Sequence, residues 1–117
     1  MTTVYSYSGV PQLVFENGYV RRFTGQPLYR FDSETLYAYT GMPLYRIRND
    51  VISRFTGEPL YRFNGEVLSR YTGVPVFRYR DRYISDYSGP FLFRIDGYLS
   101  NKELMWLFVI IAEEGVN

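Results

Sequence analysis

The sequence predicts an all-β fold. We expect six 16-residue β-hairpin repeats in a continuous antiparallel meander, closed like a flower or barrel, with one hydrophobic C-terminal α-helix. Three observations predict it: glycines recur every 16 residues from Gly9 to Gly89, aromatic side chains alternate with others between them, and a helical signature begins at Ser100. The length of 117 residues suits one core, so we expect a single domain, 1–117, with repeats over 4–99 and the helix over 100–115.

Each repeat carries the signature aromatic, Ser or Thr, then Gly. The copies are Tyr7-Ser8-Gly9, Phe23-Thr24-Gly25, Tyr39-Thr40-Gly41, Phe55-Thr56-Gly57, Tyr71-Thr72-Gly73 and Tyr87-Ser88-Gly89. A Pro stands two residues after the Gly in five copies and directly after it in the last. Arg follows at one fixed later position in five copies, where the first copy has Val14. Six aligned copies indicate a repeat architecture.

Within one repeat the residue types are typical of a β-hairpin. In the fourth copy, Pro59–Phe63 is an alternating run of β-formers with Pro only at its start, where a backbone donor is dispensable. Asn64-Gly65 is a turn pair, and 67–71 returns as the second strand. Tyr61 and Phe63 should share one face, and Arg62 the other. The register stays open, because the Asn-Gly pair of the first repeat, Asn17-Gly18, is displaced by one residue relative to Asn64-Gly65.

Closure into a ring follows from the constant period. A single repeat is too small to bury its own apolar face, so it must pack against its neighbours. Equal steps around an axis close a ring, whereas a small step gives an open solenoid. The first repeat has no atypical capping sequence, and open sheet edges favour aggregation. Both points favour a closed array over an open one.

The C-terminal segment departs from the repeat. Ser100 followed by Glu103 is a capping box, and Gly115 is a suitable helix end. Residues 104–112 are all apolar, so this helix must be buried on every side, yet it is too short to span a membrane. Its acidic end disfavours a membrane interface. Two options stay open: a plug inside its own ring, or a homo-oligomer formed through this helix. The residues expected to serve either role are Leu104, Trp106, Leu107, Phe108, Ile110 and Ile111.

The repeats resemble a known group of proteins. The pattern aromatic, Ser or Thr, Gly, any residue, Pro, then an aromatic strand containing Arg is similar to that of the bacterial β-hairpin repeat proteins called β-flowers, whose hairpins form petals around an axis. The resemblance covers residues 4 to about 100. β-flowers are described with four-fold symmetry, whereas this chain has six copies. The resemblance implies a fold and carries no catalytic motif.

Composition argues against catalysis. The chain has no His and no Cys, which removes imidazole acid–base chemistry, thiol chemistry and the usual zinc sites. Asp32, Asp50, Asp81 and Asp96 fall at expected hairpin tips, where Asp stabilises turns. Ser53, Ser69 and Ser85 recur on return strands with no neighbouring base to activate them. We therefore expect a protein that is not an enzyme and uses no cofactor or metal.

A binding role rests on arginine and tyrosine. Twelve of the 13 basic residues are Arg, which stacks on rings and forks onto carboxylates better than Lys does. The favoured interpretation is Arg packed on aromatic rings as structural support. The alternative is a repeated site for a small anion, nucleotide or glycan, with Tyr29, Arg30, Tyr45, Arg46, Tyr61, Arg62, Phe77, Arg78 and Arg94 as its residues. The net charge of +1 gives no support for nucleic-acid binding.

The leading functional expectation is a structural, self-assembling or interaction module that is not an enzyme. The small-ligand binder with repeated Tyr and Arg sites is its alternative. The sequence shows no secretory leader and no Cys, which favours a cytoplasmic over a secreted location.

Overall fold

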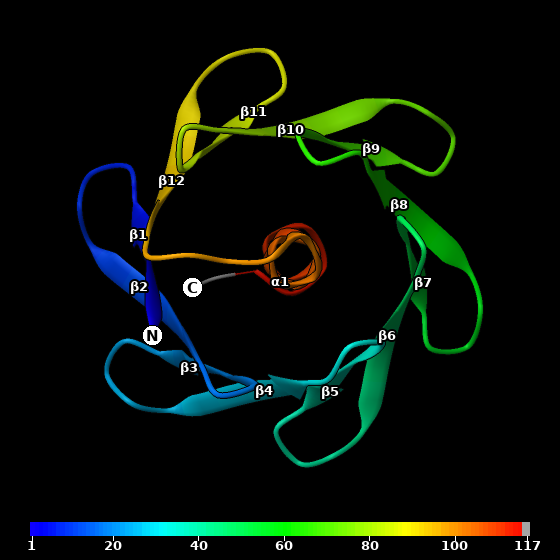
Figure 1. Ribbon diagram of the computed structural model, residues 1–117, viewed down its shortest axis with the longest axis horizontal. Coiled ribbons are helices and arrows are strands. Elements are labelled where there is room, and N and C mark those ends of the chain that lie inside the picture. The colour runs from blue at the N-terminus through cyan, green and yellow to red at the C-terminus, as the bar shows by residue number, and fades with distance from the viewer. Residues whose placement is uncertain (116–117) are drawn as a thin grey trace.

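The computed structural model describes residues 1–115, which form twelve antiparallel strands and one C-terminal helical segment (Figure 1). The strands are β1 (Thr2–Ser6), β2 (Pro11–Glu16), β3 (Tyr19–Arg22), β4 (Pro27–Phe31), β5 (Thr35–Ala38), β6 (Pro43–Arg48), β7 (Val51–Arg54), β8 (Pro59–Phe63), β9 (Val67–Arg70), β10 (Pro75–Arg80), β11 (Tyr83–Asp86) and β12 (Phe91–Asp96). The helical segment is α1 (Asn101–Val109) continued by the π-helix η1 (Ile110–Glu114).

The sheet closes into a barrel, as the constant repeat predicts. Each strand pairs with its sequence neighbours, and β1 pairs with β12 through Val4 opposite Ile95. The molecule is a disc with extents of 35 × 34 × 22 Å. Closure leaves no free strand edge among the paired strands, so the aggregation risk of a long open meander is removed.

The fixed signature builds the turns that project outward, which we call petals (Figure 1). In the first petal, between β1 and β2, Gly9 N donates to Ser6 O at 2.9 Å and Ser6 N donates to Val10 O at 2.8 Å. This is a three-residue hairpin loop whose last residue must be left-handed, and Gly9 has φ 101°. The same two hydrogen bonds recur in every later repeat of residues 1–115, which explains the strict spacing of the glycines.

A β-bulge lies at the base of each petal. On β8, for example, Pro59 is opposite Ser53 and Tyr61 is opposite Ile52, so Leu60 is the extra residue. The carbonyl of Leu60 instead accepts a hydrogen bond from Tyr71 N, at 2.9 Å, in the next petal. A bulge bends its strand, which lets the petal lean away from the barrel wall. The extra residues also link successive petals.

The opposite ends of the strands form short turns, which we call tips, and these settle the register. Phe15 lies opposite Val20 and Phe63 opposite Leu68, so the two repeats pair identically despite the displaced Asn. Asn17 occupies the tip itself with φ 52°. Asn64 precedes the tip, and its Oδ1 accepts hydrogen bonds from Glu66 N and Val67 N. The displacement therefore changes the cap of the tip and leaves the faces of the strands unchanged.

The inner face of the barrel is built from three sets of side chains that repeat every 16 residues. Tyr61, Phe63 and Leu68 represent them in one hairpin, and all three are buried. The return-strand set is Val4, Val20, Leu36, Ile52, Leu68 and Ile84, each of which is fully inaccessible to solvent. The predicted separation of Tyr61 and Phe63 from Arg62 is confirmed, and the first two face the core.

The helix fills the barrel and is capped as predicted. Glu103 N donates to Ser100 Oγ at 3.2 Å, and Ser100 N donates to Glu103 Oε1 at 3.0 Å. The side chains from Leu104 to Ile110 are buried, and Figure 1 shows α1 along the axis of the ring. Of the two options left by the sequence, the structure has the plug. The expected homo-oligomer cannot form through this helix while the barrel is closed, because its apolar side chains already contact their own chain.

The last turn of the helical segment is a π-helix, whereas the sequence predicts an α-helix through to residue 115. After Val109 the backbone widens into the π-helix η1, which ends when Gly115 N donates to Ile110 O at 2.7 Å. Gly115 is the end residue, as expected, with φ 83°. Neither α1 nor any other helix of residues 1–115 has the length and apolar character needed to cross a membrane.

Replacing Phe108 with Ala tests the plug. Phe108 is fully buried, with ring centroids 5.2 Å from Phe63 and 5.9 Å from Phe77. We expect Phe108→Ala to lower the free energy of unfolding by about 3–5 kcal/mol, measured by denaturant titration. The control Ile111→Ala, at a half-buried position of the same helix, should lose less than about 2 kcal/mol. Equal losses in the two variants would contradict the plug.

Candidate interaction surface

The expected Tyr and Arg site residues lie on opposite faces of the barrel wall. Tyr45, Tyr61 and Phe77 are buried against the plug, and Tyr29 is half-buried beside them. The Arg residues one position later point outward, where they are half-buried or exposed. The structure therefore does not bring these rings and guanidinium groups together into one repeated ligand site.

The outward Arg residues stack on aromatic rings. Within residues 1–115 the pairs are Arg30 over Tyr37 at 4.7 Å, Arg46 over Phe55 at 4.7 Å, Arg62 over Tyr71 at 4.9 Å, Arg78 over Tyr87 at 4.8 Å and Arg94 over Tyr5 at 4.4 Å. Cation–π contacts of this kind contribute about 0.5–1 kcal/mol each at exposed sites. The geometry matches the interpretation of Arg as structural support. Each ring belongs to a neighbouring strand or petal, so the stacks brace the outer wall.

The inward tyrosines contact two carboxylates at the end of the plug. Tyr61 Oη donates to Glu113 Oε2 at 2.6 Å, and Tyr45 Oη donates to Glu114 Oε2 at 2.7 Å. Tyr29 Oη reaches Glu114 Oε1 at 3.5 Å. These tyrosines come from three successive outgoing strands, β4, β6 and β8. Sequence reasoning missed this cluster, although it could have noted that Tyr occupies this ring position in the second, third and fourth repeats alone.

The three tyrosines of this cluster have raised pKa values. Burial, followed by the neighbouring Glu114, raises the pKa of Tyr29 to about 12. Burial and the hydrogen bond to Glu113 raise the pKa of Tyr61 to about 12. Tyr45 is shifted in the same direction by burial and by its bond to Glu114. All three hydroxyls stay protonated at neutral pH and donate to carboxylates, which holds the plug in one rotation and depth.

Three of the four carboxylates predicted at tips, Asp32, Asp50 and Asp81, lie between strands as expected. The prediction is wrong for Asp96, which is the last residue of β12 and lies opposite Thr3 of β1. Asp32 Oδ1 accepts hydrogen bonds from Glu34 N and Thr35 N, and Asp81 adopts φ 54° in its turn. Within residues 1–115 no three of the acidic side chains gather as metal ligands would. Ser53 and Ser69 are half-buried on return strands, and Ser85 is buried. These residues support the turns and the wall.

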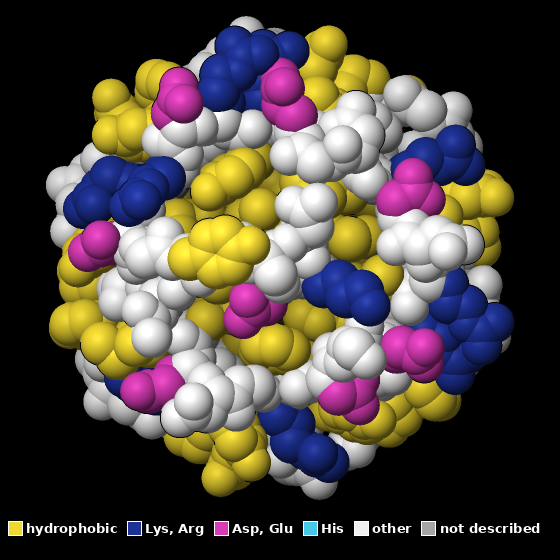
Figure 2. All heavy atoms as spheres, in the orientation of Figure 1, with side chains coloured by type: hydrophobic (Ala, Val, Ile, Leu, Met, Phe, Trp, Pro, Cys, Tyr) yellow, Lys and Arg dark blue, Asp and Glu magenta, His cyan; other side chains and the backbone are white. Residues whose placement is uncertain are grey.

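The petals carry an exposed aromatic ring on each turn, and we call these side chains the petal rim. Their exposed fractions range from 38% to 58%, and the residues are Tyr7, Phe23, Tyr39, Phe55, Tyr71 and Tyr87. Figure 2 shows hydrophobic side chains gathered in separate groups around the outer edge, with Lys and Arg side chains between them. The exposed rings are therefore spread evenly around the disc, one on each petal.

The residue that follows the turn glycine differs in polarity from petal to petal. It is apolar and exposed in the β1–β2, β5–β6 and β9–β10 petals, which we call the apolar petals, with Val10, Met42 and Val74. In the β3–β4 and β7–β8 petals it is polar and bonds to an Arg of the same turn, whereas in the β11–β12 petal it is Pro90. Arg22 Nε donates to Gln26 Oε1 at 3.2 Å, and Arg54 Nε donates to Glu58 Oε1 at 3.1 Å.

Substituting one stacked Arg tests its structural role. Arg46 lies over Phe55, whereas Arg48, two residues later on the same strand, makes no ion pair or ring contact within residues 1–115. We expect Arg46→Gln to lower the free energy of unfolding by about 0.5–1 kcal/mol and Arg48→Gln to change it by less than about 0.5 kcal/mol. Denaturant titration measures both. The same loss in both variants would remove the stacking interpretation.

Alkaline titration tests the tyrosine–glutamate cluster. Because the folded pKa values of Tyr29 and Tyr61 are raised from 10.0 to about 12, their contribution to stability is complete below pH 10 and is lost as the pH rises towards 12. We expect circular dichroism to show unfolding in this interval, together with tyrosinate absorbance. In Tyr45→Phe/Tyr61→Phe the loss of stability between pH 10 and 12 should be smaller than in the unmodified chain. An unchanged pH profile would contradict the cluster.

No family model, curated protein or solved structure matches this chain. The resemblance of the repeats to β-flowers therefore stays a prediction. The petal rim is an exposed surface that repeats on every petal.

Proposed function

We propose that this protein is an interaction module that is not an enzyme and that binds through its petal rim, with a second copy of the same chain as the partner. The observation that carries the proposal is the regular exposure of an aromatic ring on every petal of residues 1–115. Aromatic residues and Arg are the residue types enriched where proteins bind one another, whereas Lys is depleted there. The chain has 22 Tyr and Phe residues and 12 Arg, with Lys102 its single Lys.

The rim is rigid, which favours binding. Arg46, Arg62 and Arg78 hold the rings of the petal aromatics Phe55, Tyr71 and Tyr87 from one side. The backbone of each petal is fixed by its own turn bonds and by a bond to the neighbouring petal. Side chains that are already ordered lose little conformational entropy when a partner covers them.

The apolar petals favour self-association over other partners. Val10, Met42 and Val74 each lie in a petal that also exposes a rim aromatic, so three petals carry similar apolar patches. The β3–β4 and β7–β8 petals between them are more polar, and the β11–β12 petal has Pro90 and the exposed Phe91. Similar patches on two copies suit a two-fold contact, in which each copy offers the same surface. The net charge of +1 opposes such a contact only weakly.

The residue types present give catalysis little chemical support. The sequence supplies no imidazole and no thiol, and the carboxylates of Asp32, Glu113 and Glu114 accept hydrogen bonds. The alternative of a repeated Tyr and Arg ligand site has less support, because Tyr61 faces the core and Arg62 faces outward.

The double variant Met42→Glu/Val74→Glu tests self-association. Glu58 occupies the equivalent position of the β7–β8 petal and bonds to Arg54, so the fold tolerates Glu at this position of a petal. We expect the unmodified chain to sediment faster as its concentration rises, and the double variant to require at least about tenfold higher concentration for the same effect. Sedimentation velocity over a concentration series measures both.

The matched control is Glu58→Gln, because Gln26 already occupies that position in the β3–β4 petal. It should associate as the unmodified chain does. The proposal is wrong if the unmodified chain remains a monomer at every concentration, or if the double variant associates equally well.

A further inference from the structure

A cavity of about 490 Å³ lies at the tip end of the barrel, beside the start of α1. Its polar lining comes from the β6–β7 tip, the β8–β9 tip and the first turn of the helix, and the residues are Asn49, Asp50, Asn64, Asn101 and Lys102. Gly65 and the buried side chains of Phe63 and Met105 complete the lining. Three separate segments of the chain therefore bring polar groups to one place.

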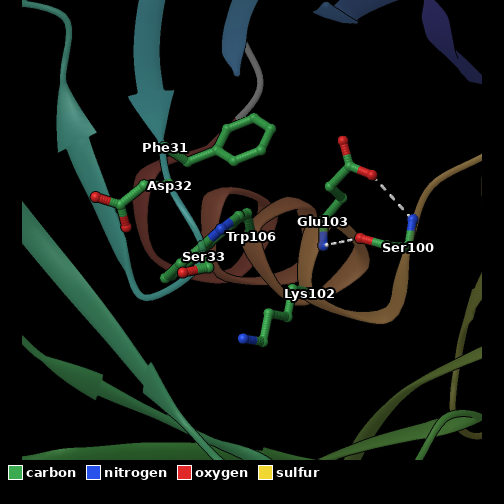
Figure 3. A pocket seen from close by; sticks show the side chains of 7 residues that line it. All are labelled: Phe31, Asp32, Ser33, Ser100, Lys102, Glu103 and Trp106. Atoms are coloured by element: carbon green, nitrogen blue, oxygen red, sulfur yellow. Dashed lines mark hydrogen bonds between the residues drawn. The ribbon is translucent and has the colours of Figure 1, made fainter. Parts of the chain in front are cut away.

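The polar side chains of this cavity can be reached from solvent, because all five residues are exposed. Lys102 also lines a smaller cavity that contains Phe31 and Glu103, and Figure 3 shows its side chain running away from both of those residues. Asn64 uses its Oδ1 to accept from two backbone N–H groups of its own tip, which leaves its Nδ2 as a donor. A ligand can therefore contact each of these groups.

The cavity carries one carboxylate and one ammonium that do not neutralise each other. Neither Asp50 nor Lys102 forms an ion pair with any residue of 1–115. They belong to different walls, the β6–β7 tip and α1. Each of these charges attracts a group of the opposite sign. An anion or a cation would satisfy only one of them, whereas a ligand that has both an ammonium and a carboxylate satisfies both.

The remaining polar groups of the cavity are carboxamides, and they belong to Asn49, Asn64 and Asn101. A carboxamide has donors and an acceptor but no charge. An apolar ligand group would cover these amides without replacing their hydrogen bonds to water, and this loss is unfavourable. An uncharged polar group replaces those bonds. The amides therefore favour a ligand whose remaining part is polar and uncharged.

We propose that this cavity binds a free α-amino acid with an uncharged polar side chain, such as L-glutamine. The ligand carboxylate would accept from Lys102 Nζ, and its ammonium would donate to the carboxylate of Asp50. Its side-chain amide would bond to the Asn side chains. A cavity of about 490 Å³ holds roughly 16 waters, so it admits such a molecule together with part of its hydration. The site lies away from the petals and does not depend on self-association.

An NMR titration of the full chain, labelled with ¹⁵N, tests the site directly. The backbone N–H of Gly65 and the side-chain amides of Asn49, Asn64 and Asn101 report from the lining itself. The ligands are L-glutamine, N-acetyl-L-glutamine, L-glutaminamide and L-leucine at matched pH and ionic strength. We expect saturable shifts of these signals with L-glutamine, and a Kd at least about tenfold higher for each of the other three. No saturable shift up to about 10 mM L-glutamine, or equal affinity for any of the three, would overturn the proposal.

Two variants test the assigned charges. Lys102→Gln should raise the Kd for L-glutamine by at least about tenfold and abolish the preference over L-glutaminamide, which lacks the carboxylate. Asp50→Asn should raise it similarly and abolish the preference over N-acetyl-L-glutamine, which lacks the ammonium. Affinity that both variants retain would place the ligand elsewhere and overturn the assignment.

The matched controls are Arg82→Gln and Asp81→Asn, which remove one charge of each sign from the β10–β11 tip, outside the lining of this cavity. Asn suits position 81, because Asn49 has φ 57° at the equivalent position of the β6–β7 tip and Asp81 has φ 54°. Both controls should leave the Kd for L-glutamine unchanged. All four substituted residues are exposed, so thermal unfolding should show the same fold in every variant. A loss of affinity in the controls equal to that in Lys102→Gln would indicate a general charge effect and overturn the proposal.

Discussion

The burial of one helix that is apolar on every side is the constraint on which the rest of the structure depends. A ring of short strands encloses a space that must be filled, and no single hairpin of this chain can cover its own inner face. The helix needs a wall on all sides, and the wall needs a core. Trp106 and Phe108 occupy the axis while residues such as Leu68 and Ile84 surround them. The helix and the wall therefore bury each other's apolar side chains.

The sequence predicts the parts of the fold that depend on local chemistry. The left-handed Gly of each petal, the capping box at Ser100 and Glu103, and the inward face of Tyr61 and Phe63 all follow from turn geometry or strand alternation. The bulge at Leu60 could not be predicted, because it depends on how two strands pair. The choice between plug and helix pairing was equally open, since an apolar sequence requires burial but does not say by which chain.

Less of the candidate sites than of the fold could be predicted from the sequence, because the sites depend on how the strands and the helix pack together. An excess of Arg over Lys indicated stacking, but whether rings or a ligand receive the guanidinium depends on the neighbouring strands. Tyr29, Tyr45 and Tyr61 carry hydroxyls on consecutive outgoing strands, a pattern visible in the sequence. The sequence does not show that these hydroxyls bond to Glu113 and Glu114. Those contacts depend on how deep the helix lies in the barrel.

Residues that depart from the 16-residue repeat are the candidates for functions other than forming the ring. Positions that obey the 16-residue period, such as Gly57 and Leu68, satisfy turns or fill the core and are needed in every repeat. The exposed side chains of Met42 at a petal and of Lys102 near the start of α1 are not required by the ring geometry. Petals and tips lie at opposite ends of the strands, so a partner on the rim and a ligand in the cavity would occupy separate surfaces. One rigid barrel can therefore support both without either site disturbing the other.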